Sequence, residues 1–533
     1  MRTFYNSKKH TDMLPKALSW RVTESVFVSL FLSLVVFLPQ WRYGFNWSDE
    51  GLLWYLSQRI HSGEIPIRDF FGYDPGRYLW SAAWFKIFGN DGLFEQRFAN
   101  AIFGAIGLGA AYAAMMACDI KRPNRIATIA LLAIALGYPQ HKVYEQSLSL
   151  IAVALTTYSL LGRQIVKRWL VFGLSTGLAA IVGRNSGVYF ALSATMALAI
   201  TWRTRSFYDA KKSFFSFLLG VAVGYAPIIL WLALDQRFLT AFVESIRFTP
   251  QWQLPLPIPF PWRVPQNWTS ISGVQVSAVS WLCVTVFAIY AVTTIRVGTV
   301  MSKRCPLGQF QILEISGLCA GLPYLHQGFE RADFSHIAQG ILPVFLIAVA
   351  RWAQSKVILA KTTYVVLLCL SLAAWIPLEP CVRAKIQLRK DPISLVHFDM
   401  GGKDFIVGRG QSQVLSTARR EFERCRCGDG QFIAMPHYPG IFAYLHTRSP
   451  YWEMYFLYKR SEEFQLSEIL VIKARQSKVA IINPSATIDG RDDLRINHTN
   501  PILAGYIRSH FERVFSTNDM PSNFELYERA CSK

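Results

Sequence analysis

The stretch that decides the fold runs from residue 213 to residue 234 and reads SFFSFLLGVAVGYAPIILWLAL. It contains no charged residue. A helix of about 20 predominantly apolar residues is long enough to cross the hydrocarbon core of a bilayer. The stretch therefore predicts a transmembrane helix.

Ten further apolar runs accompany this one along the chain. Several are shorter than a full span, so their ends are fixed only to within several residues. The pattern predicts a polytopic α-helical membrane protein with about eleven transmembrane helices. The ten runs lie at 22–38, 98–117, 126–139, 147–161, 169–183, 187–202, 271–295, 307–325, 337–350 and 362–378.

The composition agrees with a membrane protein. Of 533 residues, 52% are hydrophobic and only 17% are charged, against about a quarter charged in ordinary soluble proteins. A chain with 37 Phe, 22 Tyr and 16 Trp does not stay disordered in water. Nine Cys in this length do not form a disulfide framework, and no pair of CxxC motifs indicates a zinc site.

The net charge of +20 fits either a nucleic-acid-binding protein or a membrane protein with basic loops on one side. With a cytoplasmic N-terminus, the inside segments carry 21 basic and 3 acidic residues, and the outside loops carry 12 of each. Basic loops stay in the cytoplasm, so this orientation is predicted. The charge then reflects topology, and no nucleic-acid partner is expected.

An odd number of spans places the tail, residues 379–533, outside the cytoplasm. The tail has no apolar run of membrane length, and β-rich stretches at 431–435 and 479–482 alternate with helical segments near 411–427, 462–477 and 502–515. That alternation predicts a small extracytoplasmic α/β domain. Residues 1–378 form the predicted transmembrane domain. Disulfides or plain thiols are both compatible with the four Cys of the tail, although pairing between the closely spaced Cys425 and Cys427 is not expected; these are Cys381, Cys425, Cys427 and Cys531.

The first outside loop, residues 39–97, is long and rich in acids. It opens with Asn46-Trp47-Ser48-Asp49-Glu50-Gly51, and residues 50–60 have the apolar spacing of a helix lying in the membrane interface. Ser48 or Asp49 could simply be the N-cap of this helix. Alternatively, the Asp49 carboxylate could take a proton from a substrate hydroxyl.

Three motifs in this loop resemble the first periplasmic loop of GT-C superfamily glycosyltransferases, such as protein O-mannosyltransferases, the lipid A aminoarabinose transferase and rhizobial galacturonosyltransferases. The motifs are Asp49-Glu50-Gly51, then 63–70 (GEIPIRDF), then Asp74-Pro75-Gly76. Ile67 stands where the family more often has Tyr, and Asp74 where it often has Pro. The resemblance covers the membrane part well and the tail in outline.

The resemblance implies an inverting transfer of a sugar from a polyprenyl-phosphate donor to an extracytoplasmic acceptor, which could be a glycan, a lipid or a protein. Asp49 matches the family's catalytic acid and would be the general base. Glu50 would orient a second group or a metal ion. Glu145, after the third span, could be a solvated loop residue or could raise the pKa of Asp49 or share a divalent cation with it.

The departing phosphate needs cationic partners, and two clusters offer them. Arg184 lies between two very apolar runs, where it could face a cavity or snorkel to the interface. The cluster Arg331, Asp333 and His336 suits a phosphate-binding loop, because an arginine presents a planar fork of donors.

Further substrate contacts are expected from the first loop itself, namely Arg68, Asp69 and Tyr73. The Pro-rich segment 251–262 is expected to be extended and interfacial, either as packing or as a lid over the prenyl chain. The chain is predicted to be an integral membrane protein, and its predicted location is a bacterial inner membrane. A flippase of a lipid-linked sugar is the alternative, but it favours a midplane site between related halves, and this sequence has no internal repeat.

Overall fold

The computed structural model describes residues 14–137, 140–161, 165–204, 207–248, 254–302, 307–354, 358–514, 520–529 and 531. Within it the chain forms two compact units, each described here by itself. The first unit comprises Met1–Pro39, Asn100–Pro227 and Leu254–Glu379, and the second comprises Gln40–Ala99, Ile228–Gln253 and Pro380–Lys533.

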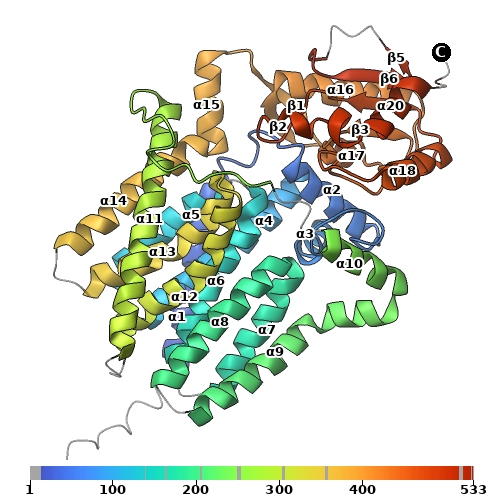
Figure 1. Ribbon diagram of the computed structural model, residues 1–533. Coiled ribbons are helices and arrows are strands. Elements are labelled where there is room, and N and C mark those ends of the chain that lie inside the picture. The colour runs from blue at the N-terminus through green and yellow to red at the C-terminus, as the bar shows by residue number, and fades with distance from the viewer. Residues whose placement is uncertain are drawn as a thin grey trace, which may run out of the picture. The chain divides into compact units, whose positions relative to one another are not determined.

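The first unit consists of helices (Figure 1). Each of the eleven apolar runs lies largely within one of these helices, because a run without charges satisfies its backbone polar groups internally when it is helical. Helices α4 and α9 continue into the second unit. The helices are α1 (Leu14–Phe37), α4 (Leu93–Ala117), α5 (Arg122–Gly137), α6 (Val143–Leu161), α7 (Ile165–Val182), α8 (Arg184–Thr204), α9 (Phe207–Leu234), α11 (Ile271–Ser302), α12 (Gln309–Glu330), α13 (Phe334–Gln354) and α14 (Ile358–Trp375), with short 3₁₀ turns at Gln140–Lys142 and Ile376–Leu378.

Six helices of the described chain are long and apolar enough to cross a membrane. A seventh is added if α5 and the segment Gln140–Leu161, which meet at 114°, count as one broken span. The expected number of about eleven is therefore not confirmed by length and composition. The shortfall has a physical reason, since helices such as α12 carry internal polar residues, among them Glu314.

Polar and small residues fix the packing of the first unit. Glu314 of α12 is buried and accepts hydrogen bonds from Arg351 of α13 at 2.8 Å and from Arg296 of α11 at 3.2 Å, so this intramembrane acid has a paired, structural role. Helices α7 and α9 touch backbone to backbone (Figure 1): a Cβ added at Gly177 would lie 2.6 Å from the backbone of Gly224. Small residues at such contacts are what allow apolar helices to approach closely.

The second unit combines helices with a small sheet (Figure 1). Four strands pair in the order β3-β4-β6-β5, with β3 and β4 parallel and the other pairs antiparallel. Strands β3 (Phe432–Met435) and β4 (Val479–Ile482) are wholly buried, as expected of continuous apolar runs. The remaining strands are β5 (Glu512–Arg513), β6 (Glu525–Glu528) and the antiparallel hairpin of β1 (Leu395–Asp399) and β2 (Asp404–Gly408).

The helices of the second unit come from three separate parts of the chain. Contacts group the first loop with residues after Glu379, whereas the order of the sequence assigns that loop to the transmembrane part. The division of the chain at residue 378 remains a sequence-based prediction. The helices are α2 (Asp49–His61), α3 (Gly76–Phe88), α10 (Gln236–Phe248), α15 (Pro380–Lys390), α16 (Arg409–Arg424), α17 (Pro439–Leu445), α18 (Glu462–Ala474), α19 (Ile496–Thr499) and α20 (Pro501–His510), with a 3₁₀ turn at Asp492–Leu494.

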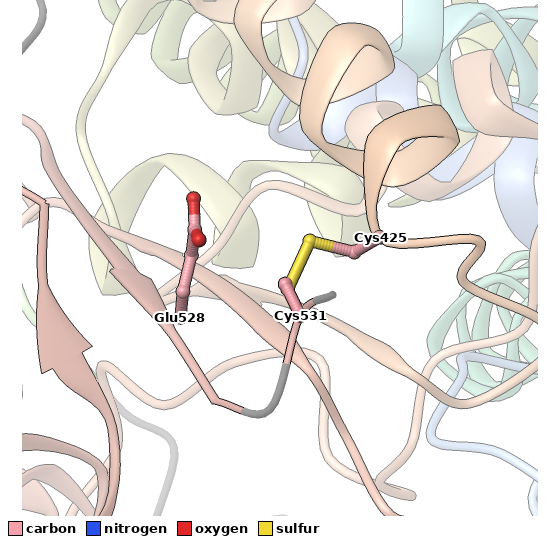
Figure 2. Close-up of side chains that lie close together, drawn as sticks. All are labelled: Cys425, Glu528 and Cys531. Carbon is pink, nitrogen blue, oxygen red and sulfur yellow. A yellow bond between two sulfur atoms is a disulfide. The ribbon is translucent and has the colours of Figure 1, made fainter. Parts of the chain in front are cut away.

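A disulfide joins Cys425, at the end of α16, to Cys531 (Figure 2). It decides between the two possibilities that the sequence left open for these residues, while Cys427 remains a thiol. The Glu528 carboxylate lies near the two sulfurs. Because both sulfurs are bonded to each other, they are not thiolate ligands, and this cluster is not a metal site.

Candidate functional site in the first loop and the tail

Asp49 is the first residue of α2. The residue before it, Ser48, makes no capping hydrogen bond with its side chain; its hydroxyl donates instead to the backbone oxygen of His437 at 2.9 Å. The Asn46 side-chain oxygen accepts the backbone N–H groups of Ser48 and Asp49 at 3.1 and 3.0 Å. Ser48, one of the two N-cap residues that the sequence offered, therefore occupies the N-cap position, but its side chain bonds to His437 and does not cap the helix.

The glycine of the Asp49-Glu50-Gly51 motif has a packing reason. A Cβ added at Gly51 would lie 2.6 Å from the backbone of Gly440, and the Gly440 N–H donates to the oxygen of Trp47 at 2.9 Å. Any side chain at position 51 would push α2 away from α17. The motif therefore places Asp49 beside residues 437–440 of the tail.

Glu50 and Asp49 are neighbours with opposite environments. Glu50 is buried and forms a two-pronged ion pair with Arg97, with contacts of 2.7 and 2.8 Å. Arg97 also donates to the backbone oxygens of Trp41 and Gly44, so the pair ties the start of α2 to the chain leading into it. The Asp49 side chain, by contrast, is 47% exposed.

The tail contributes aromatic and imidazole side chains next to Asp49. The His437 Nε2 atom lies 3.9 Å from Asp49 Oδ1, and the His437 ring stacks on Tyr455 with ring centroids 3.8 Å apart. The Tyr73 hydroxyl donates to the Tyr455 hydroxyl at 3.3 Å. Burial raises the pKa of both phenols, and the charge of Asp49 raises it further, so both hydroxyls remain protonated around the carboxylate.

The rest of the first loop is held by ion pairs and by the tail. Arg68 contacts two carboxylates, Asp69 at 2.7 Å and Asp235 at 2.6 Å. Partial burial opposes ionisation of Asp69, but hydrogen bonds from Arg68 and from the Ile65 N–H outweigh it and lower the Asp69 pKa. The charge of Arg68 is thus already balanced within the second unit.

Ile67 adopts a φ of 73°, which is unusual for a β-branched residue and costs of the order of 1–3 kcal/mol. Its N–H donates to the Phe70 oxygen at 2.9 Å, and its oxygen accepts from the Trp452 indole at 3.1 Å. These two bonds hold the strained turn in place. The departure from the family pattern at position 67 therefore lies at a turn that the tail stabilises.

The first unit contains the other predicted residues. Asp333 precedes α13 and accepts hydrogen bonds from Arg331 at 2.7 Å, from Ser335, and from His336 at 2.7 Å. Burial opposes its ionisation, but the bonds from His336 and Ser335 and the charge of Arg331 hold the Asp333 pKa well below its ordinary value. The segment is anchored by Leu256, whose N–H donates to the Glu330 oxygen and whose oxygen accepts from Ala332, both at 3.3 Å.

Two predicted residues lie at helix starts of the first unit. Glu145 is in the first turn of α6, and Arg184 is the first residue of α8, directly after the turn at Gly183. Both side chains are partly buried. Of the Pro-rich segment 251–262, residues 251–253 lie outside the described residues, and the remainder is largely extended.

A polar cluster near Arg331 could not be found from the sequence. The Tyr189 hydroxyl accepts from the Gln327 amide at 2.6 Å and lies 3.1 Å from His326 Nδ1, and His326 also approaches Glu330 at 3.9 Å. These residues belong to α8 and α12, and no local motif links them. His437 and Tyr455 were missed for the same reason, since both lie in the tail, far along the chain from Asp49.

The structure thus places Tyr73 near Asp49 through Tyr455, and pairs Arg68 with Asp69, in the second unit. It brings Arg331, Asp333 and His336 together in the first unit. Among the described residues, neither Asp49 nor Glu145 belongs to a group of three His, Cys, Asp or Glu side chains close enough to hold an ion. Asp49 and Glu145 lie in different units, so a cation shared between them remains a prediction.

Comparison with known proteins identifies the fold. No protein-family model and no curated protein matches the sequence. ArnT from Cupriavidus metallidurans, solved with undecaprenyl phosphate, is similar in structure with a TM-score of 0.52 at 12% identity, over 97% of this chain and 99% of ArnT. The Archaeoglobus fulgidus oligosaccharyltransferase, tethered to an acceptor peptide, gives a TM-score of 0.49 at 12% identity, over 96% of this chain and 75% of its own.

The chain therefore shares the fold of ArnT. The resemblance drawn from the first loop is confirmed at the level of the fold, and the likeness to ArnT spans nearly the whole of both chains.

Proposed function

We propose that the protein is a membrane glycosyltransferase that moves a sugar from a polyprenyl-phosphate donor to an extracytoplasmic acceptor, with Asp49 as the general base. The observation that carries this proposal is the contrast at the start of α2, where Glu50 is buried against Arg97 while the Asp49 carboxylate is half exposed. The likeness to ArnT, whose structure contains undecaprenyl phosphate, supports a lipid-linked donor.

In the proposed reaction, an acceptor hydroxyl gives its proton to Asp49 while its oxygen bonds to the anomeric carbon of the donor sugar. The bond from that carbon to the phosphate oxygen breaks, and the electron pair leaves with the lipid phosphate. Attack from the face opposite the phosphate inverts the anomeric centre. A base positioned at the hydroxyl typically contributes a factor of about 10²–10⁴ in rate.

Arg184 and Arg331 are the proposed partners of the departing phosphate. The Nε group of Arg331 donates to Asp333, which orients a guanidinium whose planar set of donors suits phosphate oxygens. His336 supports Asp333 in the same loop. Cationic groups fixed where charge develops are an effective way to lower such a barrier.

The remaining first-loop and α6 residues have supporting roles in this proposal. Glu50 fixes the start of α2 through Arg97, and Tyr73 shapes the surroundings of Asp49 through Tyr455. Arg68 and Asp69 are proposed to contact substrate by exchanging existing ion pairs, and Glu145 to assist Asp49 directly or through a divalent cation. No step of the reaction requires that cation.

The proposed topology follows from the charge distribution. The N-terminus is cytoplasmic, about eleven helices span the membrane, and the first loop and the tail as an α/β domain are extracytoplasmic. The bacterial inner membrane is the proposed location.

Mass spectrometry of envelope glycans and glycolipids tests the proposal. Cells expressing the chain, cells lacking it, and cells with Asp49→Asn are compared, with Asp404→Asn as a control in an exposed ion pair of the β1–β2 hairpin. We expect one sugar to be missing both without the chain and with Asp49→Asn, and present with Asp404→Asn. A normal product from Asp49→Asn at wild-type protein level would refute Asp49 as the base. A flippase would lose the sugar on deletion but not with Asp49→Asn.

A further inference from the structure

The tautomer of His437 follows from its contacts. Its Nδ1 atom lies 2.7 Å from the backbone oxygen of Met454. A carbonyl oxygen only accepts hydrogen bonds, so Nδ1 carries a hydrogen. In the neutral ring the second nitrogen, Nε2, is then an acceptor. The stacking on Tyr455 fixes the plane of the ring and therefore the direction of Nε2.

Nε2 is an unused acceptor in a built site. The His437 side chain is only 8% exposed, and no group of the described residues makes a hydrogen bond to Nε2. Its nearest carboxylate oxygen is Asp49 Oδ1 at 3.9 Å. Leaving such a buried atom unpaired is costly, which points to a ligand that supplies the donor.

Asp49 can accept a hydrogen bond at the same place. A carboxylate has about four acceptor positions, and the Asp49 carboxylate is half exposed, so a substrate hydroxyl can reach it. Two acceptors 3.9 Å apart require two donors, whereas a lone hydroxyl has one hydrogen. Neighbouring hydroxyl groups on a sugar ring present two O–H donors side by side, one for each of these acceptors.

We propose that Asp49 and His437 together bind two neighbouring hydroxyl groups of a carbohydrate acceptor. The inference rests on the proposed function and adds the class of the acceptor. The hydroxyl at Asp49 loses its proton to the carboxylate and its oxygen bonds to the donor sugar. The hydroxyl beside it keeps its proton and donates to His437 Nε2. A phosphate has no donor for this pair of acceptors, and a serine or threonine hydroxyl has only one.

Periodate oxidation provides the test, because it cleaves neighbouring diols and leaves isolated hydroxyls and phosphates intact. Membranes carrying the full-length chain with their own donor lipid are mixed with the envelope glycan fraction of cells lacking the chain. That fraction is mock-treated or treated with periodate, then reduced and freed of reagent. We expect transfer to the mock-treated fraction and loss of transfer to the treated one. The donor membranes are never treated with periodate. A loss of transfer is therefore caused by oxidation of the acceptor and not by oxidation of a diol of the donor sugar.

Variants of His437 supply a second measurement. His437→Asn keeps a side-chain N–H for Met454 but removes Nε2, and we expect about a tenfold rise in the acceptor KM with a smaller change in kcat. His437→Gln, which extends an amide toward the lost position, should recover part of that affinity. His397→Asn, in the exposed pair with Asp404, is the matched control and should leave the acceptor KM unchanged.

The outcomes separate the two proposals. No transfer to the mock-treated fraction would overturn the glycosyltransferase and the acceptor inference together. Transfer that periodate does not reduce would overturn the acceptor inference alone, as would linkage analysis showing the sugar on a protein hydroxyl or a phosphate. An unchanged acceptor KM in His437→Asn would also overturn it.

Discussion

Two Asp–His pairs in this protein differ in a way that separates structure from chemistry. Asp333 and His336 are three residues apart at the start of α13 and contact each other at 2.7 Å, and Arg331 and Ser335 complete the shell of the carboxylate. Asp49 and His437 come from opposite ends of the chain and stand 3.9 Å apart, with Nε2 unused among the described residues. We call the first the closed pair and the second the open pair.

The difference teaches what each carboxylate can do. In the closed pair, hydrogen bonds within one loop stabilise the charged carboxylate and lower its pKa, so the pair orders a loop and orients an arginine. In the open pair, the surrounding residues hold the two groups in position without joining them. Such preorganisation is useful only if a ligand fills the space.

The largest expected effect on stability concerns Glu50, the buried and ion-paired neighbour of Asp49. Arg97→Ala leaves the buried Glu50 carboxylate without its partner, and breaking such a pair costs about 3–5 kcal/mol. Thermal unfolding of the purified protein in detergent, followed by tryptophan fluorescence, measures the loss. Arg491→Ala, in an exposed pair with Asp493, should change little. Equal behaviour of the two variants would show that Glu50 and Asp49 do not differ as described.

A second prediction asks whether a buried carboxylate that accepts hydrogen bonds, like Asp333 in the closed pair, always has a lowered pKa. Glu468 of α18 accepts the Trp452 N–H at 3.0 Å, yet burial and the nearby charge of Glu453 raise its pKa to about 7. The folded state therefore holds a proton that the unfolded chain, with a pKa near 4.5, gives up at lower pH. Stability should fall as the pH rises between these values, by at most about 3 kcal/mol.

Glu468→Gln removes the titration and keeps the side chain's shape. We expect this variant to unfold at a higher temperature than wild type at about pH 8 and at nearly the same temperature at about pH 4. Parallel pH profiles for the two proteins would contradict a raised pKa at Glu468.

A smaller effect is expected in the closed pair itself. Asp333→Asn keeps a good N-cap residue but loses the charge that Arg331 and His336 stabilise, at a cost of about 1–2 kcal/mol. Because the Asp333 pKa is lowered below its ordinary 3.8, wild type should keep this contribution at neutral pH and lose it progressively as the pH falls below 3.8 toward the lowered pKa. The variant should be less sensitive over that range. Ser335→Ala, which removes a single hydroxyl from the shell, is the milder comparison.

The smallest effect on stability is expected in the open pair. Asp49→Asn removes a half-exposed charge that makes no hydrogen bond to His437. The free energy of unfolding of this variant should therefore match that of wild type to within about 0.5 kcal/mol. The same variant is expected to lose sugar transfer. A destabilisation as large as that of Arg97→Ala would instead assign Asp49 a structural role and remove the contrast between the pairs.

Much of the fold could be predicted from local sequence. Each apolar run became a helix, and α2 begins at the acid that the loop motif indicated, because helix formation depends on hydrogen bonds between residues four apart. The cap was predicted less well, since the Ser48 hydroxyl donates to His437 and Asn46 accepts the N–H groups of Ser48 and Asp49. The number of about eleven spans is not confirmed, because six or seven spans among the described residues pass a test of length and apolar composition.

The residues of the candidate site also differ in whether local sequence reveals them. Asp49 was recognisable because a short motif surrounds it, and the cluster of Arg331, Asp333 and His336 because six residues contain it. His437 and Tyr455 were not recognisable, since the contact that aligns them with Asp49 is the meeting of Gly51 and Gly440. A tertiary contact of that kind leaves no spacing in the sequence.

By itself, therefore, the sequence determined the helical membrane character, the acid-rich first loop and the GT-C resemblance, because apolar length, charge asymmetry and short motifs are local properties. Only the tertiary structure decided which of two adjacent acids is buried, which histidine faces Asp49, and which cysteine pairs with Cys425. Those outcomes depend on the distances between side chains far apart in the sequence, and such distances are set by packing.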